Sequence, residues 1–317
     1  MRYLILSFWL CVFFLAACSS DAEREPFTLT EGAIVFRDSL AIDDSDFSFS
    51  FVFNPRIFQD TLLGFGDGTF RSINLFHART GAFLTNYERD SIDSYIIPEK
   101  DMSFFYVHED EIYILNDLVQ KIFVFTLDKQ FKRKIDLVMP DAHTKPTYEG
   151  IFTRVDDTFY ISTVHDGTLA EQFKYSKLVS VFDLEGNFSH SFGSYPESYT
   201  QGNLVLSTNE HKVIKGDRMF ILNVAGLPVL KEYSLAGELQ AIYPLSPPSF
   251  DTEIGFYQSD PFASPLTDQM NGLALDPADP RDILYASFSS FDTRERSSYG
   301  LSTYRWIILR IDLDAKT

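Results

Sequence analysis

Six histidines are the side chains of this chain best suited to moving protons near neutral pH. His165 and Asp166 are adjacent, as in a general base with an orienting carboxylate, but successive side chains of a strand point to opposite faces. We therefore interpret His165–Gly167 as a turn. The sequence contains no Gly-x-Ser-x-Gly segment and no His-x-x-x-His pair, so it predicts no catalytic residue. The histidines lie in six different segments, as His77, His108, His143, His165, His190 and His211.

Glycines and carboxylates cluster at three places. Gly64–Gly68 has the composition of a phosphate-binding loop, but such a loop needs a helix N-terminus after it, and strand-like residues follow instead. We interpret it as a turn between strands. Asp43, Asp44 and Asp46 lack the glycine and the glutamate of an EF-hand-type loop, so a solvated loop is expected. Asp276–Asp282 contains two prolines and is interpreted as a turn. None of these clusters predicts a metal or cofactor site.

The N-terminus carries an apolar segment that ends in a cysteine. Leu4–Ala17 contains no charge and follows Arg2; it is shorter than the roughly 20 residues that cross a bilayer, and is typical of a signal peptide. Its end, Leu15-Ala16-Ala17-Cys18, resembles the lipobox of bacterial lipoproteins. The resemblance implies that residues 1–17 are removed and that the sulfur of Cys18 is diacylated. The alternative, a cysteine in an ordinary N-terminal helix, leaves this sequence context unexplained.

The residues after Cys18 indicate where the protein is anchored. Residues 18–28 are expected to form a lipidated acidic tether between the signal peptide and a folded domain of residues 29–317. Ser19 stands where an aspartate would resemble an inner-membrane retention signal, so we expect an outer-membrane lipoprotein. Ser19–Glu25 also looks like the acidic tags of some surface lipoproteins, although a plain solvated tether fits equally well. The sequence therefore leaves two locations possible for the anchored protein, the periplasmic face of the outer membrane and the cell surface.

The composition narrows the class of protein and of partner. The 317 residues carry a net charge of −18, which argues against binding to nucleic acid or to anionic lipid through the protein surface itself. The membrane is therefore expected to be reached through the lipid anchor only. The 31 phenylalanines and 16 tyrosines favour strands over helices.

Short apolar segments recur as a strand, a turn of a few residues and a second strand, each preceded by a further strand. The spacing of about 50 residues, with about four strands in each unit, is typical of propeller blades. We predict an all-β fold, a β-propeller of six blades with four antiparallel strands each; five or seven blades stay open, because the interval from Leu235 to Leu313 is long. Gly32–Phe36 is expected to add an outer strand to the last blade and so close the ring. Ser246–Asp268 is interpreted as an insertion. The clearest copies begin at Lys121, Leu178 and Val229, with looser copies at Ile73 and Ile308.

The hairpin Phe182-Asp183-Leu184-Glu185-Gly186-Asn187-Phe188 behind a lipobox resembles those of the TolB-like six-bladed β-propeller lipoproteins of unknown function from Gram-negative bacteria. A second segment, Met270–Pro277, is similar to the Asn-Gly-Leu segment of gluconolactonase-like propellers. That resemblance implies Asn271 as a ligand of a divalent cation, with Glu149 and with Asn116 or Asn223. A later Asp-Gly segment of that family is missing here, so we interpret Asn271-Gly272 as a turn leading into an inner strand.

The function predicted from the sequence is that of a binding or scaffolding module. Its ligand, an envelope protein or a glycan, is expected at the loop-lined mouth or in the central channel, and the protein is expected to be a monomer without a cofactor. The alternative is a metal-dependent hydrolase of the lactonase type, with its site on the propeller axis. Aromatic side chains in predicted surface loops are candidate binding platforms for such a ligand. They are Tyr195, Tyr199, Tyr257 and Phe262.

Overall fold

The chain divides into two compact units, residues 1–42 and 43–317. The computed structural model describes residues 27–29, 32–34, 41–42, 49, 52–67, 72–88, 104–147, 150–197, 210–223, 228–245, 269–275, 283–291 and 304–312. In the first unit, β1 (Phe27–Leu29) and β2 (Gly32–Ile34) form an antiparallel hairpin. The described part of Gly32–Phe36 is β2, which pairs with β1 within this unit, and its expected role in closing the ring stays a prediction.

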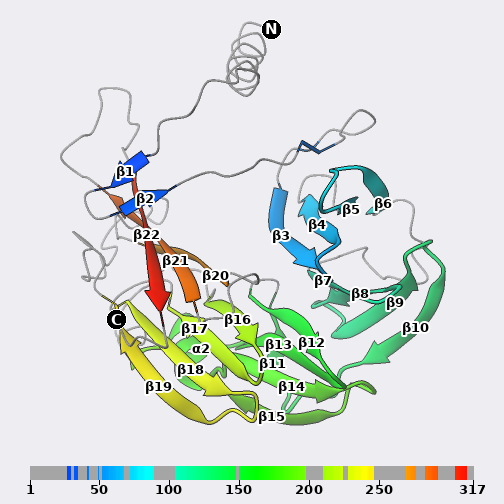
Figure 1. Cartoon of the computed structure of the whole chain (residues 1–317). Coiled ribbons are helices and arrows are strands. Elements are labelled where there is room, and N and C mark those ends of the chain that lie inside the picture. Colours follow the sequence, from blue (N-terminus) through cyan, green and yellow to red (C-terminus); the bar gives the residue numbers. More distant parts are fainter. Residues whose placement is uncertain are drawn as a thin grey trace, which may run out of the picture. The chain divides into compact units, whose positions relative to one another are not determined.

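The described residues of the second unit form five antiparallel sheets, labelled in chain order in Figure 1. The first two sheets contain β3 (Val52–Phe58), β4 (Leu62–Asp67), β5 (Ser72–His77) and β6 (Phe83–Glu88), then β7 (Phe104–His108), β8 (Glu111–Asn116), β9 (Lys121–Thr126) and β10 (Phe131–Asp136). The third contains β11 (Thr144–Pro146), β12 (Phe152–Val155), β13 (Thr158–His165), β14 (Val179–Asp183) and β15 (Phe188–Phe192), with helix α2 (Leu169–Tyr175) between β13 and β14. The last two contain β16 (His211–Lys215), β17 (Arg218–Leu222), β18 (Val229–Ser234) and β19 (Leu239–Pro244), then β20 (Gln269–Leu275), β21 (Ile283–Phe291) and β22 (Tyr304–Asp312).

The order of strands within the sheets is that of propeller blades. Four of the sheets run up and down from their first strand to their last, whereas β11 and β12 of the third both pair with β13. β12 and the first strands of the other sheets contact one another between sheets: β7 contacts β3 and β12, and β16 contacts β20. These contacting strands are therefore innermost, and the last strand of each sheet along the chain lies at the outer edge. The outer strand β10 is correspondingly exposed along most of its length, whereas the middle strands β8 and β9 are buried.

Buried side chains join each sheet to the next. Four clusters of apolar residues each contain members from two successive sheets, so the blades pack face to face through their large side chains. Representative members from the two sides are Phe58 and Phe105, Tyr113 and Phe159, Tyr160 and Met219, and Phe220 and Leu284. This arrangement explains the high aromatic content, because wide blades need large side chains to fill the space between them.

The all-β prediction and the repeated hairpins are confirmed, but the predicted number of blades is wrong. The copies that begin at Lys121, Leu178 and Val229 are the β9–β10, β14–β15 and β18–β19 hairpins. The described residues of the second unit form five sheets instead of six; the third has an additional strand, β11, and three strands of the last are described. The spacing of the repeats is uneven along the sequence, so dividing the chain length by it overestimates the number of blades.

The interpretation of Gly64–Gly68 as a turn is also wrong for the residues that the structure describes. Residues 64–67 lie within β4 and pair with β5. A Cβ atom on Gly64 would lie 2.8 Å from a ring carbon of Phe105 in the next sheet. Glycine at this position therefore lets the Phe105 ring approach the backbone, which is a packing role and not a phosphate-binding one.

Candidate functional site

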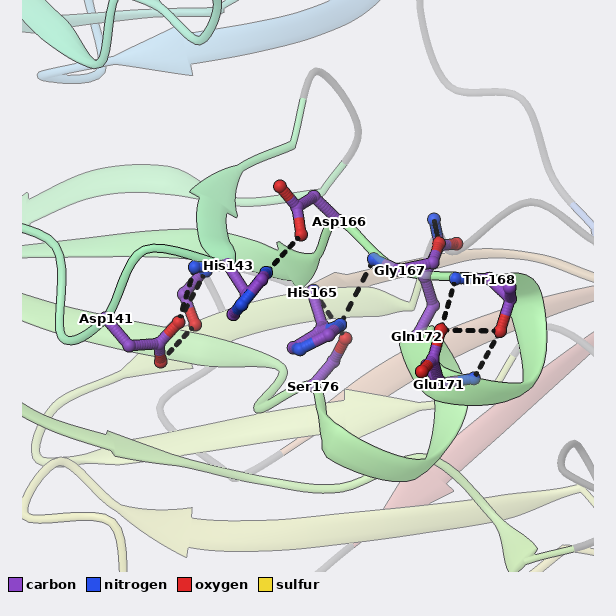
Figure 2. Close-up of polar contacts among 10 residues, drawn as sticks. Asp141, His143, His165, Asp166, Gly167, Thr168, Glu171, Gln172 and Ser176 are labelled. Carbon is purple, nitrogen blue, oxygen red and sulfur yellow. Dashed lines mark hydrogen bonds and ion pairs between the residues drawn. The ribbon is translucent and has the colours of Figure 1, made fainter.

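Two histidines that are 22 positions apart in the sequence meet at one end of the third sheet. Thr144, the first residue of β11, is the register partner of His165, the last residue of β13. This pairing places His143, just before β11, opposite Asp166, just after β13. The two segments are joined twice: the backbone N–H of Asp166 donates to the carbonyl oxygen of His143 at 2.8 Å, and His143 Nδ1 lies 3.0 Å from Asp166 Oδ1 (Figure 2).

The hydrogen bonds give the two imidazoles different proton positions. His143 Nδ1 faces a carboxylate oxygen, which only accepts, so the proton of this ring lies on Nδ1 and Nε2 is open as an acceptor. His165 Nδ1 accepts the backbone N–H of Gly167 at 3.1 Å, so the proton of the neutral ring lies on Nε2. The pair therefore presents one accepting and one donating Nε2 atom.

A series of three rings results from this arrangement. The centroids of the His143 and His165 rings are 5.2 Å apart with an interplanar angle of 25°, and the His165 and Tyr175 centroids are 5.6 Å apart. The side chain of His143 is 68% exposed and Tyr175 is 55% exposed. We call His143, His165 and Tyr175, together with the carboxylates of Asp166 and Asp141, the imidazole–tyrosine surface.

Helix α2 holds this surface rigidly. Thr168 and Glu171 form a capping box, in which Glu171 Oε2 accepts the Thr168 N–H at 2.8 Å and the Thr168 side chain accepts from the Glu171 N–H (Figure 2). Phe173 is buried in the core, and its ring meets that of Tyr195 edge-on at 5.2 Å. Ser176, just after the helix, accepts the N–H of His165 at 2.8 Å through its hydroxyl. The helix is thus capped at its start and tied to the rest of the blade by Phe173 and by Ser176.

Asp141 shapes the turn that leads to His143. Its Oδ1 accepts the backbone N–H groups of His143 at 2.7 Å and Thr144 at 2.8 Å, and its Oδ2 accepts the Thr144 hydroxyl at 2.8 Å. Partial burial alone would raise the pKa of Asp141, but these hydrogen bonds outweigh it and hold the pKa below its usual value. The charged form of Asp141 therefore stabilises the fold at neutral pH, and this contribution is lost as the pH falls through the lowered pKa.

Asp141→Asn is expected to lower the free energy of unfolding at pH 7 by about 1 kcal/mol, because hydrogen bonds to a charged acceptor become bonds to an amide. The difference should begin to shrink as the pH falls below about 4, the usual pKa of an aspartate, and should vanish below the lowered pKa of Asp141. Urea unfolding at pH 7 and at pH 3 measures both values. Asp60→Asn, at an exposed turn, serves as the control. A difference that is equal at both pH values would contradict this account of Asp141.

The metal ligands implied by the lactonase resemblance lie on different sheets: Asn116 ends β8, Asn223 follows β17 and Asn271 lies in β20. Asn116 is buried at the end of β8, and its Oδ1 accepts the backbone N–H of Val119 at 3.2 Å, so it closes a turn. Asn271 lies inside β20 at a register shift between Met270 and Gly272, so the interpretation as a turn before the strand is wrong. Glu149 lies outside the described residues. Among the residues that are described, no three His, Cys, Asp or Glu side chains are arranged to hold a metal ion.

The remaining sequence candidates have different outcomes. Tyr195 is buried and packs against α2, so its prediction as an exposed platform is wrong. Asp166 and Gly167 form a bend directly after β13, and Asp166 contacts His143 instead of orienting its neighbour His165. No helix in the described part is long and apolar enough to cross a membrane. Several candidates lie outside the described residues: Cys18, Asp43, Asp44, Asp46, Tyr199, Ser246–Asp268 with Tyr257 and Phe262, and Asp276–Asp282.

Sequence comparison finds no relative for this chain: no protein-family model matches it, and no curated protein matches it significantly. Solved structures do match. A member of the DUF4221 family from Bacteroides vulgatus has a TM-score of 0.56 at 8% identity, over 84% of this chain and 79% of that chain. The two chains share the β-propeller fold. A candidate exported protein from Bacteroides fragilis has a TM-score of 0.41 at 12% identity, over 86% of this chain and 73% of that chain. Streptogramin B lyase has a TM-score of 0.43 at 11% identity, over 84% and 86%. The similarity to the DUF4221 structure, at 8% identity, shows the fold alone, and no activity is inferred from it.

Proposed function

We propose that this propeller is a lipid-anchored binding module of the bacterial envelope that recognises a glycan at the imidazole–tyrosine surface. The lipobox-like segment ending at Cys18 supports the anchor, and the repeated hairpins behind it support kinship with the TolB-like envelope lipoproteins. The observation that carries the binding function is the exposed series of rings formed by His143, His165 and Tyr175, with carboxylates beside it.

The chemistry of this surface matches that of a sugar. The apolar C–H face of a pyranose packs on a flat ring such as that of Tyr175 or His143, while its hydroxyls need acceptors and donors close by. Asp166 supplies carboxylate oxygens, and the two imidazoles supply an acceptor at one Nε2 and a donor at the other. Hydrogen bonds to a charged acceptor are stronger than those between neutral groups, which helps to offset the loss of water from the hydroxyls.

The rigidity of the surface favours binding. Residues of Leu169–Tyr175 and the turn before it are held by the capping box, by Phe173 in the core and by the paired hydrogen bonds between His143 and Asp166. Few side chains would have to be ordered when a ligand arrives, so little of the interaction free energy would be lost to conformational entropy. The sequence also allows an envelope protein as the ligand, and the test below distinguishes binding of a protein from binding of a glycan.

Tyr175→Ala is expected to weaken binding of a glycan about tenfold, because an aromatic contact of this kind contributes about 1 kcal/mol or slightly more. Tyr175→Phe keeps the ring and should bind within about twofold of the wild type. A glycan array that includes bacterial and host polysaccharides would first select the oligosaccharide, and calorimetry with the full chain would then measure its dissociation constant. Leu118→Ala, at an exposed apolar residue of the second sheet, is the control.

Two results would overturn the proposed function. One is that the full chain binds no glycan on the array while it captures a purified envelope protein at the same surface. The other is that a bound oligosaccharide is held equally well by wild type and by Tyr175→Ala. Asp166→Asn distinguishes the contribution of the carboxylate, because it keeps the size of the side chain and removes its charge.

A further inference from the structure

A second polar cluster lies at the innermost strands of three sheets, about the backbone of Gly150. The guanidinium of Arg56, in β3, donates from Nη1 to the carbonyl oxygen of Phe152 at 2.9 Å and from Nη2 to that of Gly150 at 3.4 Å. From the other side, Lys212 of β16 approaches so closely that a Cβ atom on Gly150 would lie 3.2 Å from its Nζ. We call Arg56, Gly150 and Lys212 the axial basic cluster.

Glycine is required at the centre of this cluster. Gly150 has a φ of +117°, and a Cβ there would lie 2.2 Å from Ser162 Oγ and 2.8 Å from Ser162 Cβ. Ser162 is buried, and its hydroxyl accepts the N–H of Ile151 at 2.8 Å. The backbone of this segment is therefore fixed against Ser162, and it presents the Gly150 carbonyl to Arg56 while leaving room for the Lys212 ammonium group.

Both cations are partly withdrawn from water, and among the described residues the carboxylate that acts on Lys212 is that of Glu210. Burial lowers the pKa of Arg56, and a weaker interaction with Tyr106 opposes this. Burial also lowers the pKa of Lys212 to about 8, although the carboxylate of Glu210 raises it in part. In the described part of the chain, neither Arg56 nor Lys212 forms an ion pair with a carboxylate within 4.0 Å; the hydrogen-bond partners of both are backbone carbonyl oxygens.

The local charge is opposite to that of the whole protein. The net charge of the chain is −18, yet Arg56 and Lys212 both approach Gly150, and Lys231 lies two strands from Lys212 in the same sheet. One carboxylate, Glu210, acts on the pKa of both lysines. Arg56 and Lys212 thus lie near one carboxylate, and partly desolvated cations in excess of carboxylates are stabilised by an added anion. Arg56 and Lys212 are both only half-buried, which leaves them accessible to a small ligand.

We propose that the axial basic cluster binds the oxyanion group, a carboxylate or a phosphate, of a small ligand, with the Arg56 guanidinium and the Lys212 ammonium as its two charged donors. A guanidinium has five N–H donors, of which two are used by the carbonyls, and an ammonium has three, of which one is used by the Glu210 carbonyl. The remaining donors can bind the oxygens of the ligand. This site is separate from the imidazole–tyrosine surface and does not depend on the proposed glycan recognition.

The bound oxyanion also makes the site sensitive to pH. It would stabilise the protonated form of Lys212, and affinity should fall as the pH rises through about 8 because the free amine has lost its charge. The other titratable groups around the site are Arg56, Glu210, Lys231, Tyr106 and Tyr233. Burial raises the pKa values of the two tyrosines, so both phenols stay neutral over this interval.

Calorimetry and thermal unfolding of the full chain with glucose, glucuronate and glucose 6-phosphate test the site. These ligands share a sugar ring and differ in having no oxyanion, a carboxylate or a phosphate. We expect one or both of the charged ligands to bind and to raise the melting temperature, and glucose to do neither. The stronger of the two identifies which oxyanion the site prefers. Binding should be at least tenfold weaker at pH 9.5 than at pH 6.5.

Lys212→Gln is expected to weaken that binding at least tenfold, and Lys134→Gln, at an exposed position of β10, should leave it unchanged. If Lys212→Gln does not fold, the comparison of wild type at the two pH values still tests the proposal. The proposal is overturned if neither charged ligand binds, if glucose binds equally well, or if Lys212→Gln binds as the wild type does. Tyr175→Ala should not alter oxyanion binding, so failure here and failure of the glycan proposal are distinguishable.

Discussion

Gly150→Ala is expected to lower the free energy of unfolding by roughly 3 kcal/mol or more, from the positive φ and the steric overlap together. A residue with a Cβ is strained at φ +117°, and the new methyl group would overlap the buried Ser162, whose Cβ lies 2.8 Å from its position. Relief of the overlap requires Ser162 to move and to lose its hydrogen bond with the Ile151 N–H. The same change would displace the carbonyl that Arg56 contacts, so oxyanion binding should be lost as well.

Gly216→Ala separates the two causes. Gly216 also has a positive φ, +59°, but no atom lies within 4 Å of the position of its Cβ. This variant should lose only about 1 kcal/mol, the cost of the left-handed conformation alone. Urea unfolding of both variants under the same conditions gives the comparison. Equal losses in the two variants would show that the segment around Gly150 is not packed against Ser162 as described.

Cys18→Ala is expected to move the protein from the membrane fraction to the soluble fraction and to abolish labelling by fatty acid. Each buried CH₂ group of an acyl chain contributes about 0.8 kcal/mol, and two chains hold a protein stably where one would exchange. The net charge of −18 gives the rest of the surface no attraction for anionic lipid. Once residues 1–17 are removed, no other feature of the protein would keep it on the membrane without the lipid.

Fractionation with a labelled fatty acid measures the result, with Cys11→Ala as the matched control. Cys11 lies within the segment that is predicted to be removed, so its replacement should leave labelling and location unchanged. A Cys18→Ala protein that is processed, labelled and still in the membrane fraction would refute the anchor.

The strands could be predicted because their signal is local. A segment such as Lys121–Thr126 is apolar and short, a turn follows it, and the side chains needed to recognise it are all within the segment. The number of blades depends on which strands are grouped into one sheet. That grouping is set by contacts between distant parts of the chain and leaves no local pattern in the sequence. Gly64 was misinterpreted for a related reason, because the ring that requires a glycine there belongs to Phe105 in the next sheet.

The candidate sites could be predicted only in part. In the sequence His165 and Asp166 are adjacent, but the imidazole that contacts the Asp166 carboxylate is that of His143. The pairing of β11 with β13 brings these two side chains together. β11 has only three residues, too few for a recognisable pattern. Arg56 and Lys212 are further apart still, and nothing near either residue indicates that both lie at the backbone of Gly150.

The most direct test of the central claim is a titration of the full chain, labelled with ¹³C in its histidine rings, with the oligosaccharide selected on the array. Imidazole resonances report on contacts at each ring separately. Recognition at the imidazole–tyrosine surface predicts that the signals of His143 and His165 shift at the concentrations at which binding occurs, while those of His77 and His108 do not. Binding that leaves His143 and His165 unshifted would contradict the account.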